Sequence, residues 1–89
     1  MLIPHDSNQF QRDLKKILKR GYDSQKLKTV LKLLIDEQPL PTKFRDHPLT
    51  GGYKDFRECH IEPDWLLIYQ KDAENIFFAR IGSHSDLFD

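Results

Sequence analysis

The second half of the 89-residue sequence contains three histidines that could do chemistry. His47 stands in Asp-His-Pro-Leu, His60 in Cys-His-Ile-Glu-Pro-Asp-Trp, and His84 in Gly-Ser-His-Ser-Asp-Leu-Phe. Because histidine titrates near neutral pH, it can serve as a general base or as a general acid. The fourth histidine, His5, has no companion group and is interpreted as structural or incidental. The candidates for acid–base chemistry therefore lie in residues 46–89.

Two of these histidines have neighbours that could orient or assist them. His60 ends one predicted strand and Asp64 begins the next, and a proline between them favours a tight turn. We expect this hairpin to bring His60 and Asp64 together, where the carboxylate would fix the tautomer of the imidazole. If His84 starts a helical turn, Phe88 lies on the same face four residues later. Each residue also has an ordinary interpretation, as a surface histidine, a turn residue or a plug for the core.

Metal and thiol chemistry are less well supported by the sequence. His47, His60, Asp64 and His84 could in principle ligate zinc, but the chain has none of the usual spaced pairs, such as HxxxH, CxxC or HExxH. We therefore expect neither a metal nor another cofactor. Cys59 is the only cysteine, which excludes an internal disulfide, and we expect it to be a buried small residue rather than a nucleophile.

The first half of the chain predicts two amphipathic helices after a short strand at residues 2–3. Apolar residues recur with helical spacing over residues 10–18 and again over residues 27–35. The candidate N-caps are Asp6 or Ser7 for the first helix and Asp23 or Ser24 for the second. Gly21 can end the first helix, and Pro39 and Pro41 stop the second. Because the connection is short, the pair is expected to form an antiparallel helical hairpin.

The second half predicts a small sheet. A loop over residues 36–52 should lead into three strands, at residues 53–61, 65–69 and 76–81, the last two joined by a polar turn. Residues 83–88 should form one short helical turn. The predicted order is β-α-α-β-β-β, an α+β fold in which the helical hairpin packs on a mainly antiparallel sheet. The whole chain, residues 1–89, is expected to be a single domain.

The net charge of zero hides a strong asymmetry along the chain. Residues 1–45 hold ten Lys and Arg against five Asp and Glu, a charge of +5, whereas residues 46–89 hold four against nine, a charge of −5. A basic half suits a polyanion or an acidic protein, although lysines often only solvate surface helices. No apolar run approaches the roughly 20 residues of a membrane span. With no secretory signal in the sequence, we expect a cytoplasmic protein without membrane contact.

The three histidines belong to longer motifs that occur in a fixed order. These motifs read Asp46-His47-Pro48-Leu49-x-Gly, then Tyr53-Lys54-x-Phe56-Arg57-x-x-His60-Ile61-Glu62-Pro63-Asp64-Trp65-Leu66-Leu67-Ile68-Tyr69, then Arg80-x-Gly82-x-His84-x-x-Leu87-Phe88. Together they resemble the YafQ group of toxins in the RelE superfamily, over roughly residues 39–89, while the N-terminal helices agree mainly in pattern. The fold that this resemblance implies is the one expected from periodicity.

The resemblance also implies an activity, which is metal-independent cleavage of mRNA in the decoding site of the ribosome by a toxin that pairs with an antitoxin. RNA carries its own nucleophile, the 2′-hydroxyl, so the protein must supply a base, an acid and positive charge. By resemblance, His84 is the expected general acid, and His60, oriented by Asp64, the expected general base. The other matched residues are His47 and Arg80, with catalytic roles, and Phe88, Trp65, Lys54 and Arg57, which would bind substrate.

Several alternatives stay open at this point. Trp65 could be a core residue instead of stacking on a base, and Arg80 could be a structural ion-pair partner. The lysine-rich helices would contact ribosomal RNA phosphates, and any contact with operator DNA would be made through the antitoxin. A non-catalytic RNA- or antitoxin-binding module would keep its binding after loss of the histidines. A metallohydrolase would contain stoichiometric zinc.

Overall fold

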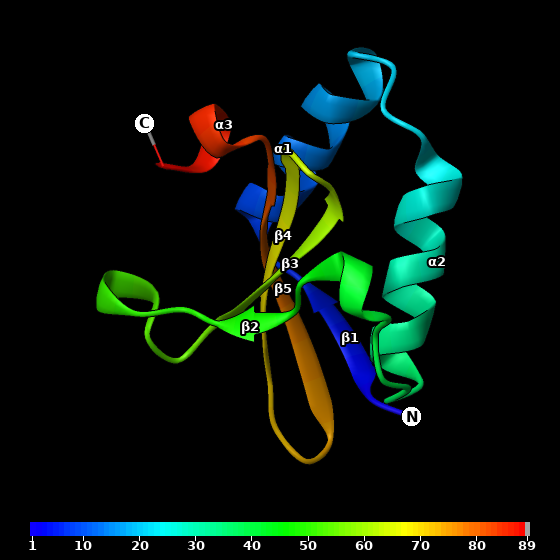
Figure 1. Cartoon of the computed structure of the whole chain (residues 1–89), viewed down its shortest axis with the longest axis vertical. Helices are drawn as coiled ribbons and strands as arrows, with labels where there is room; N and C mark the ends of the chain where they lie inside the picture. Colours follow the sequence, from blue (N-terminus) through cyan, green and yellow to red (C-terminus); the bar gives the residue numbers. More distant parts are fainter. Residues whose placement is uncertain (89) are drawn as a thin grey trace.

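A five-stranded sheet in the order β1-β5-β4-β3-β2 organises the computed structural model, which describes residues 1–88 (Figure 1). Its strands are β1 (Ile3–Asp6), β2 (His47–Pro48), β3 (Arg57–Glu62), β4 (Trp65–Lys71) and β5 (Asn75–Gly82). β1 runs parallel to β5, and the other neighbouring strands are antiparallel. The predicted α+β order and the mainly antiparallel sheet are confirmed, with β2 as one strand that was not predicted.

Two helices cover one face of this sheet. α1 (Asn8–Lys19) begins after Ser7, whose hydroxyl accepts a hydrogen bond from the amide of Phe10, and α2 (Ser24–Ile35) begins after Asp23. α1 packs mainly against β5 and α2 against β3, so each helix rests on its own part of the sheet. Seven basic side chains of these helices are exposed: Arg12, Lys15, Lys16, Lys19, Lys26, Lys28 and Lys32. Within residues 1–88, no helix has the length and apolarity that crossing a bilayer requires.

The main hydrophobic core lies between these two helices and the sheet. Trp65 of β4 is only 1% exposed and meets Tyr22 edge-on, with ring centroids 5.0 Å apart. β4 is apolar on both faces, because Leu66 and Ile68 point away from this core into a second, smaller cluster. That cluster includes Leu87 of α3 (His84–Phe88), and α2 and α3 lie on opposite sides of the strands (Figure 1). β4 is therefore the central strand that its sequence predicts.

The loop predicted over residues 36–52 contains more structure than expected. It holds two 3-10 turns, η1 (Thr42–Phe44) and η2 (Gly51–Tyr53), on either side of β2. Between η1 and β2, Arg45 takes the left-handed conformation with a φ of 49°, and its carbonyl accepts a 2.6 Å hydrogen bond from Nδ1 of His47. This turn aligns β2 with the beginning of β3. A two-residue strand is too short to produce a periodic pattern, so β2 could not be predicted from the sequence.

Candidate active site

The structure brings the three predicted histidines together at one end of the sheet, from three different elements. His60 lies on β3 beside Leu66 of β4, which places its side chain on the face opposite α1 and α2. His47 comes from β2 and His84 from the first position of α3. The ring of His60 stands 6.1 Å from that of His47 and 6.0 Å from that of His84, centroid to centroid. We call this line of three imidazoles the histidine row.

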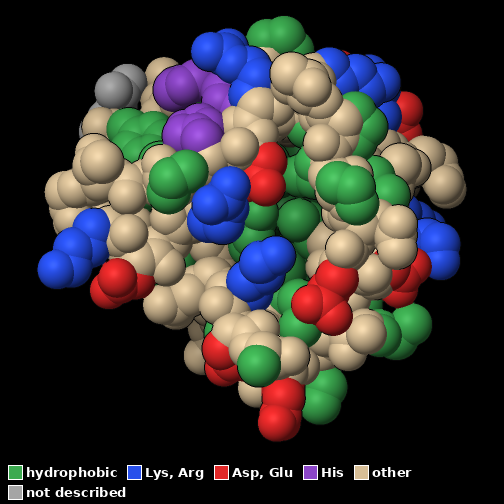
Figure 2. Space-filling view, turned by 60° about the horizontal axis from the view of Figure 1, so that its bottom comes forward, with side chains coloured by type: hydrophobic (Ala, Val, Ile, Leu, Met, Phe, Trp, Pro, Cys, Tyr) green, Lys and Arg blue, Asp and Glu red, His purple; other side chains and the backbone are tan. Residues whose placement is uncertain are grey.

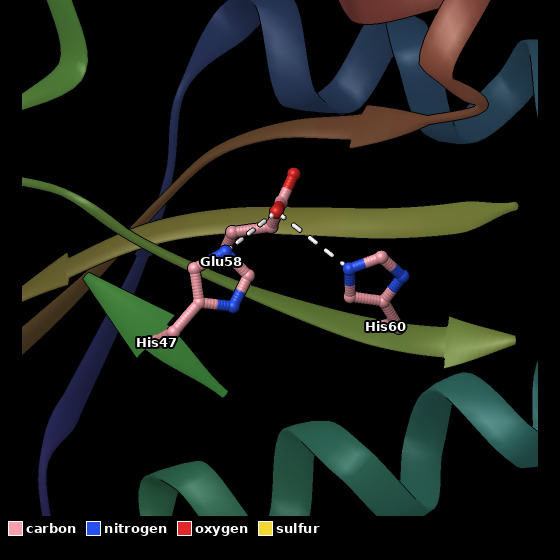
Figure 3. A group of neighbouring side chains, drawn as sticks. All are labelled: His47, Glu58 and His60. Carbon is pink, nitrogen blue, oxygen red and sulfur yellow. Dashed lines mark ion pairs between the residues drawn. The ribbon is translucent and has the colours of Figure 1, made fainter. Parts of the chain in front are cut away.

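A buried carboxylate, Glu58, joins two members of the row. Its Oε2 lies 3.1 Å from Nε2 of His47 and 3.6 Å from Nε2 of His60 (Figure 3). Glu58 is 6% exposed and His60 is 7% exposed, so both are largely removed from solvent. Sequence reasoning did not select Glu58 as a site residue. Its signal was the two-residue spacing from His60, which puts both side chains on the same face of a strand.

The predicted contact between His60 and Asp64 is wrong. Nδ1 of His60 lies 3.1 Å from the carbonyl oxygen of Pro63 instead. The carboxylate of Asp64 accepts two hydrogen bonds from His84, one from its backbone amide at 2.9 Å and one from Nδ1 at 2.7 Å. The register between β3 and β4 shifts between His60 and Glu62, and Asp64 comes to lie beside the start of α3.

The hydrogen bonds from His84 have two consequences. They hold the pKa of Asp64 below its ordinary value, with the backbone amide as the larger cause and the imidazole as the next. The carboxylate is therefore charged at neutral pH and can only accept, so Nδ1 of His84 is the nitrogen that carries a proton toward it. This fixes the ring so that Nε2 points away from Asp64 and can face a ligand.

An exposed aromatic side chain stands at the end of the row. Phe88 follows His84 by one helical turn, as predicted, and their rings lie 6.2 Å apart. Tyr53 meets the other side of Phe88 edge-on at 6.2 Å, so η2 and α3 support each other here. Because Phe88 is 46% exposed, its ring is accessible to a flat ligand next to His84.

Arg80 is held by an acid on the neighbouring helix. Its Nε and one terminal nitrogen lie 2.8 and 3.2 Å from the two carboxylate oxygens of Asp13, which also accepts a hydrogen bond from the amide of Ile81. The hydrogen bonds that Arg80 donates to Asp13 raise the pKa of Arg80. Burial raises the pKa of Asp13, but hydrogen bonds from Arg80, Gln9 and Ile81 outweigh it, and the net shift is downward. The ion-pair interpretation of Arg80 is therefore confirmed, and its contact with phosphate stays a prediction.

The predicted substrate-binding residues fall into two groups. Lys54 is exposed just after η2, and Arg57 is half-buried at the start of β3, with Nε 3.3 Å from a carboxylate oxygen of Asp46. Trp65 is buried in the main core, so its interpretation as a stacking residue is wrong and the core alternative is right.

Cys59 lies where expected, whereas His5, expected to have no companion group, contacts two side chains. Cys59 is fully buried, and this burial raises the pKa of its thiol to about 12, so it is no nucleophile at neutral pH. His5 lies on β1, where its Nε2 is 2.8 Å from the side-chain oxygen of Asn75 and its ring stacks on Phe77.

The donor atoms of His47, Glu58 and His60 could also hold a metal ion, since they all lie within 4.8 Å of one another. Two imidazoles and a carboxylate suit zinc or copper. This set differs from the zinc ligands considered from the sequence. Asp64 and His84 are hydrogen-bonded to each other, and Glu58 replaces Asp64 as the carboxylate of the cluster.

Known proteins share both the sequence and the fold of this chain. Residues 3–89 match the family described as the bacterial toxin of type II toxin–antitoxin systems, YafQ. The mRNA interferase toxin YafQ of Escherichia coli is 45% identical over 83 residues, which cover 92% of this chain and 90% of that protein. A crystal structure of the E. coli DinJ-YafQ toxin-antitoxin complex contains a chain with 42% identity and a TM-score of 0.92, covering 99% of this chain and 98% of that one.

A crystal structure of a metal-bound toxin from Helicobacter pylori is 52% identical, with a TM-score of 0.91, and covers 99% of this chain and 100% of that one. These matches extend over both the N-terminal helices and the motifs that contain the histidine row. The resemblance drawn from the three motifs is confirmed: this chain belongs to the YafQ family of toxins of bacterial type II toxin–antitoxin systems.

Proposed function

We propose that this chain is an endoribonuclease that cleaves mRNA on the ribosome by histidine acid–base catalysis and is inhibited by a protein antitoxin. The observation that carries this proposal is the pair of carboxylate–imidazole contacts in the site, Asp64 with His84 and Glu58 with His60. A relative of 45% identity is named an mRNA interferase, and another related chain is bound to the antitoxin DinJ. The cytoplasm, where ribosomes and mRNA meet, is the proposed location.

His84 is the proposed general acid. Its Nδ1 proton is engaged by Asp64, so in the imidazolium form the proton on Nε2 is the one that can be given to the 5′-oxygen leaving group. The negative charge of Asp64 stabilises this imidazolium before the transfer. The arrangement has the same logic as the acid that orients the histidine of a catalytic triad.

His60 is the proposed general base, with Glu58 as its supporting carboxylate in place of Asp64. Because the carbonyl of Pro63 can only accept, Nδ1 of His60 carries the proton and Nε2 has the lone pair in the neutral ring. Nε2 takes the proton from the 2′-hydroxyl, and Glu58, 3.6 Å away, stabilises the imidazolium that forms. His47, when protonated, adds positive charge beside the phosphate.

The bonds and protons balance without another reactant. The 2′-oxygen forms a bond to phosphorus, the bond from phosphorus to the 5′-oxygen breaks, and the leaving oxygen receives its proton from His84. The products are a 2′,3′-cyclic phosphate and a 5′-hydroxyl. If zinc or copper were bound by His47, Glu58 and His60, it would supply Lewis-acid polarisation of a phosphate oxygen. A chelator therefore belongs in any assay of this activity.

Substrate contacts surround these groups. Phe88 is exposed beside His84 and can stack on an unpaired base, while Arg80, held by Asp13, would bind a phosphate through its remaining terminal nitrogen. Lys54 and Arg57 extend the positive charge, and the lysines of α1 and α2 would contact ribosomal RNA in a salt-sensitive way.

The test is cleavage of a translated reporter mRNA in a cell-free system that contains a metal chelator specific for zinc and copper. His84→Ala should lower the cleavage rate by about 10²–10⁴-fold, the usual contribution of one proton transfer. His5→Ala is the matched control, since His5 lies on β1, outside the histidine row, and should cleave like the wild type. Equal cleavage by wild type and His84→Ala would overturn the assignment. Antitoxin binding without any cleavage by the wild type would favour the non-catalytic module.

A further inference from the structure

A pocket with a volume of about 470 Å³ opens beside His60, between α2, η1 and the end of β3. This volume lies within the range of roughly 300–1,000 Å³ that is usual for ligand sites. The pocket has an apolar part, a cationic part and a polar remainder. Its apolar residues are Phe44, Ile61 and Pro63, and its cationic ones are Lys26, Lys43 and Arg45. Figure 2 shows histidines gathered beside Lys and Arg side chains and a hollow with hydrophobic side chains in its floor.

The pocket exists because β2 is short. β2 pairs only with Arg57 and Glu58, so over residues 1–88 the rest of β3, from Cys59 to Glu62, has no strand on that edge. η1 lies across this edge, with Phe44 partly buried against the main core. The left-handed turn at Arg45 then returns the chain to β2. The same turn thus shapes both the pocket and the position of His47.

The charge of the pocket favours an anion. Its lining has three cations and one carboxylate, Glu62, which forms an ion pair with Lys26 at 2.9 Å. Lys43 and Arg45 therefore give the pocket a positive surplus. Nζ of Lys43 stands over the Phe44 ring, 5.2 Å from its centre, so a cation and an aromatic ring share one part of the pocket. Cations that track a backbone, next to a ring on which a base can stack, are the features that bind single-stranded nucleic acid.

We propose that this pocket binds one nucleotide of the RNA substrate, next to the nucleotide that is cleaved. Its base would lie against Phe44 and Ile61, and its phosphate would be held by Lys43 and Arg45. RNA is the occupant because His60 belongs both to the wall of the pocket and to the histidine row, so a strand bound at the row can extend into the pocket. The inference rests on the proposed ribonuclease function and names a second contact of the same substrate.

The experiment measures binding of a short, fluorescein-labelled single-stranded RNA whose 2′-hydroxyls are methylated, so that it cannot be cleaved. Lys43→Glu should weaken binding on the order of tenfold and reduce the slope of log K against log salt by about 0.7 or more, the value for one phosphate contact on a single strand. Lys71→Glu is the matched control. Lys71 is an exposed lysine at the end of β4 opposite to Leu66, the residue that pairs with His60, and the change in charge is the same. Phe44→Leu, which keeps an apolar side chain, should weaken binding by about fivefold or more through lost stacking.

The outcomes separate this inference from the proposed function. If Lys43→Glu and Lys71→Glu bind RNA equally, with equal salt slopes, or if the wild type does not bind this RNA, the pocket assignment is overturned even where cleavage depends on His84. If Lys43→Glu loses RNA binding while His84→Ala cleaves like the wild type, the pocket assignment stands and the catalytic proposal fails. An effect of Lys43→Glu on antitoxin binding alone would also overturn the assignment. Unchanged circular dichroism melting confirms that each variant is folded.

Discussion

Replacement of Asp13 by asparagine tests how α1 is tied to the sheet and how Arg80 is aimed. Asp13 accepts hydrogen bonds from Nε of Arg80 at 2.8 Å, from a terminal nitrogen of Arg80 at 3.2 Å, from the amide of Ile81 at 3.1 Å and from the side chain of Gln9 at 2.9 Å. Asparagine has almost the same shape, but it lacks the charge and one acceptor. The guanidinium of Arg80 would then lose its partner.

The cost in stability follows from burial. Breaking a buried ion pair costs about 3–5 kcal/mol, but solvent screening lowers that figure here because the Arg80 side chain is 26% exposed. We expect Asp13→Asn to lower the free energy of unfolding by about 2–3 kcal/mol. In a domain of this size each kcal/mol shifts Tm by about 4–8 °C, so Tm should fall by about 8–24 °C.

The pH dependence has a definite sign. Folding lowers the pKa of Asp13 below its ordinary value of 3.8, so the charged carboxylate stabilises the folded state. This contribution is complete well above pH 3.8 and is lost as the pH falls through the folded pKa. Urea denaturation followed by circular dichroism, at a series of pH values, should show a constant difference between wild type and Asp13→Asn near neutrality that shrinks in acid. The exposed Asp55→Asn is the control. Equal stability of Asp13→Asn and wild type at neutral pH, or a difference that grows in acid, would refute the reasoning.

Three further predictions concern the site and the core. Glu58→Gln should lower cleavage in the cell-free assay by about 10²–10⁴-fold, because the imidazolium of His60 loses its supporting charge; an unchanged rate would contradict the role of Glu58. Cys59, whose thiol pKa is raised to about 12 by burial, should react with iodoacetamide only as fast as the protein unfolds, and rapid labelling of the native protein would show local opening of β3. Within residues 1–88 the buried indole N–H of Trp65 has no hydrogen-bond partner. Trp65→Phe should therefore lower the free energy of unfolding, measured by urea denaturation, by only about 1–2 kcal/mol, with RNA binding retained. Loss of RNA binding would return Trp65 to the substrate site.

The features that the sequence predicted well are those fixed by local pattern. The helices follow from apolar spacing and from the caps Ser7 and Asp23, and β4 follows from its unbroken apolar run. The motifs selected His47, His60 and His84, which the structure places in one row.

The features that the sequence did not predict depend on how strands align. Glu58 reaches His47 only because β2 pairs with β3, and nothing local indicates that pairing. Asp64 was assigned to the wrong histidine because a shift in strand register, invisible in the sequence, sets it beside His84. Trp65 fits a motif and a core position equally well, and only its burial separates the two roles.

The parallel pairing of β1 with β5 sets the order in which the protein can be completed. Ile3 aligns with Asn75, 72 positions later, so β1 waits for its partner strand throughout synthesis. At about 5–20 residues per second, that wait lasts roughly 4–14 seconds. Because His84 follows β5, the histidine row can be complete only after both partners of the β1–β5 pair have been synthesised.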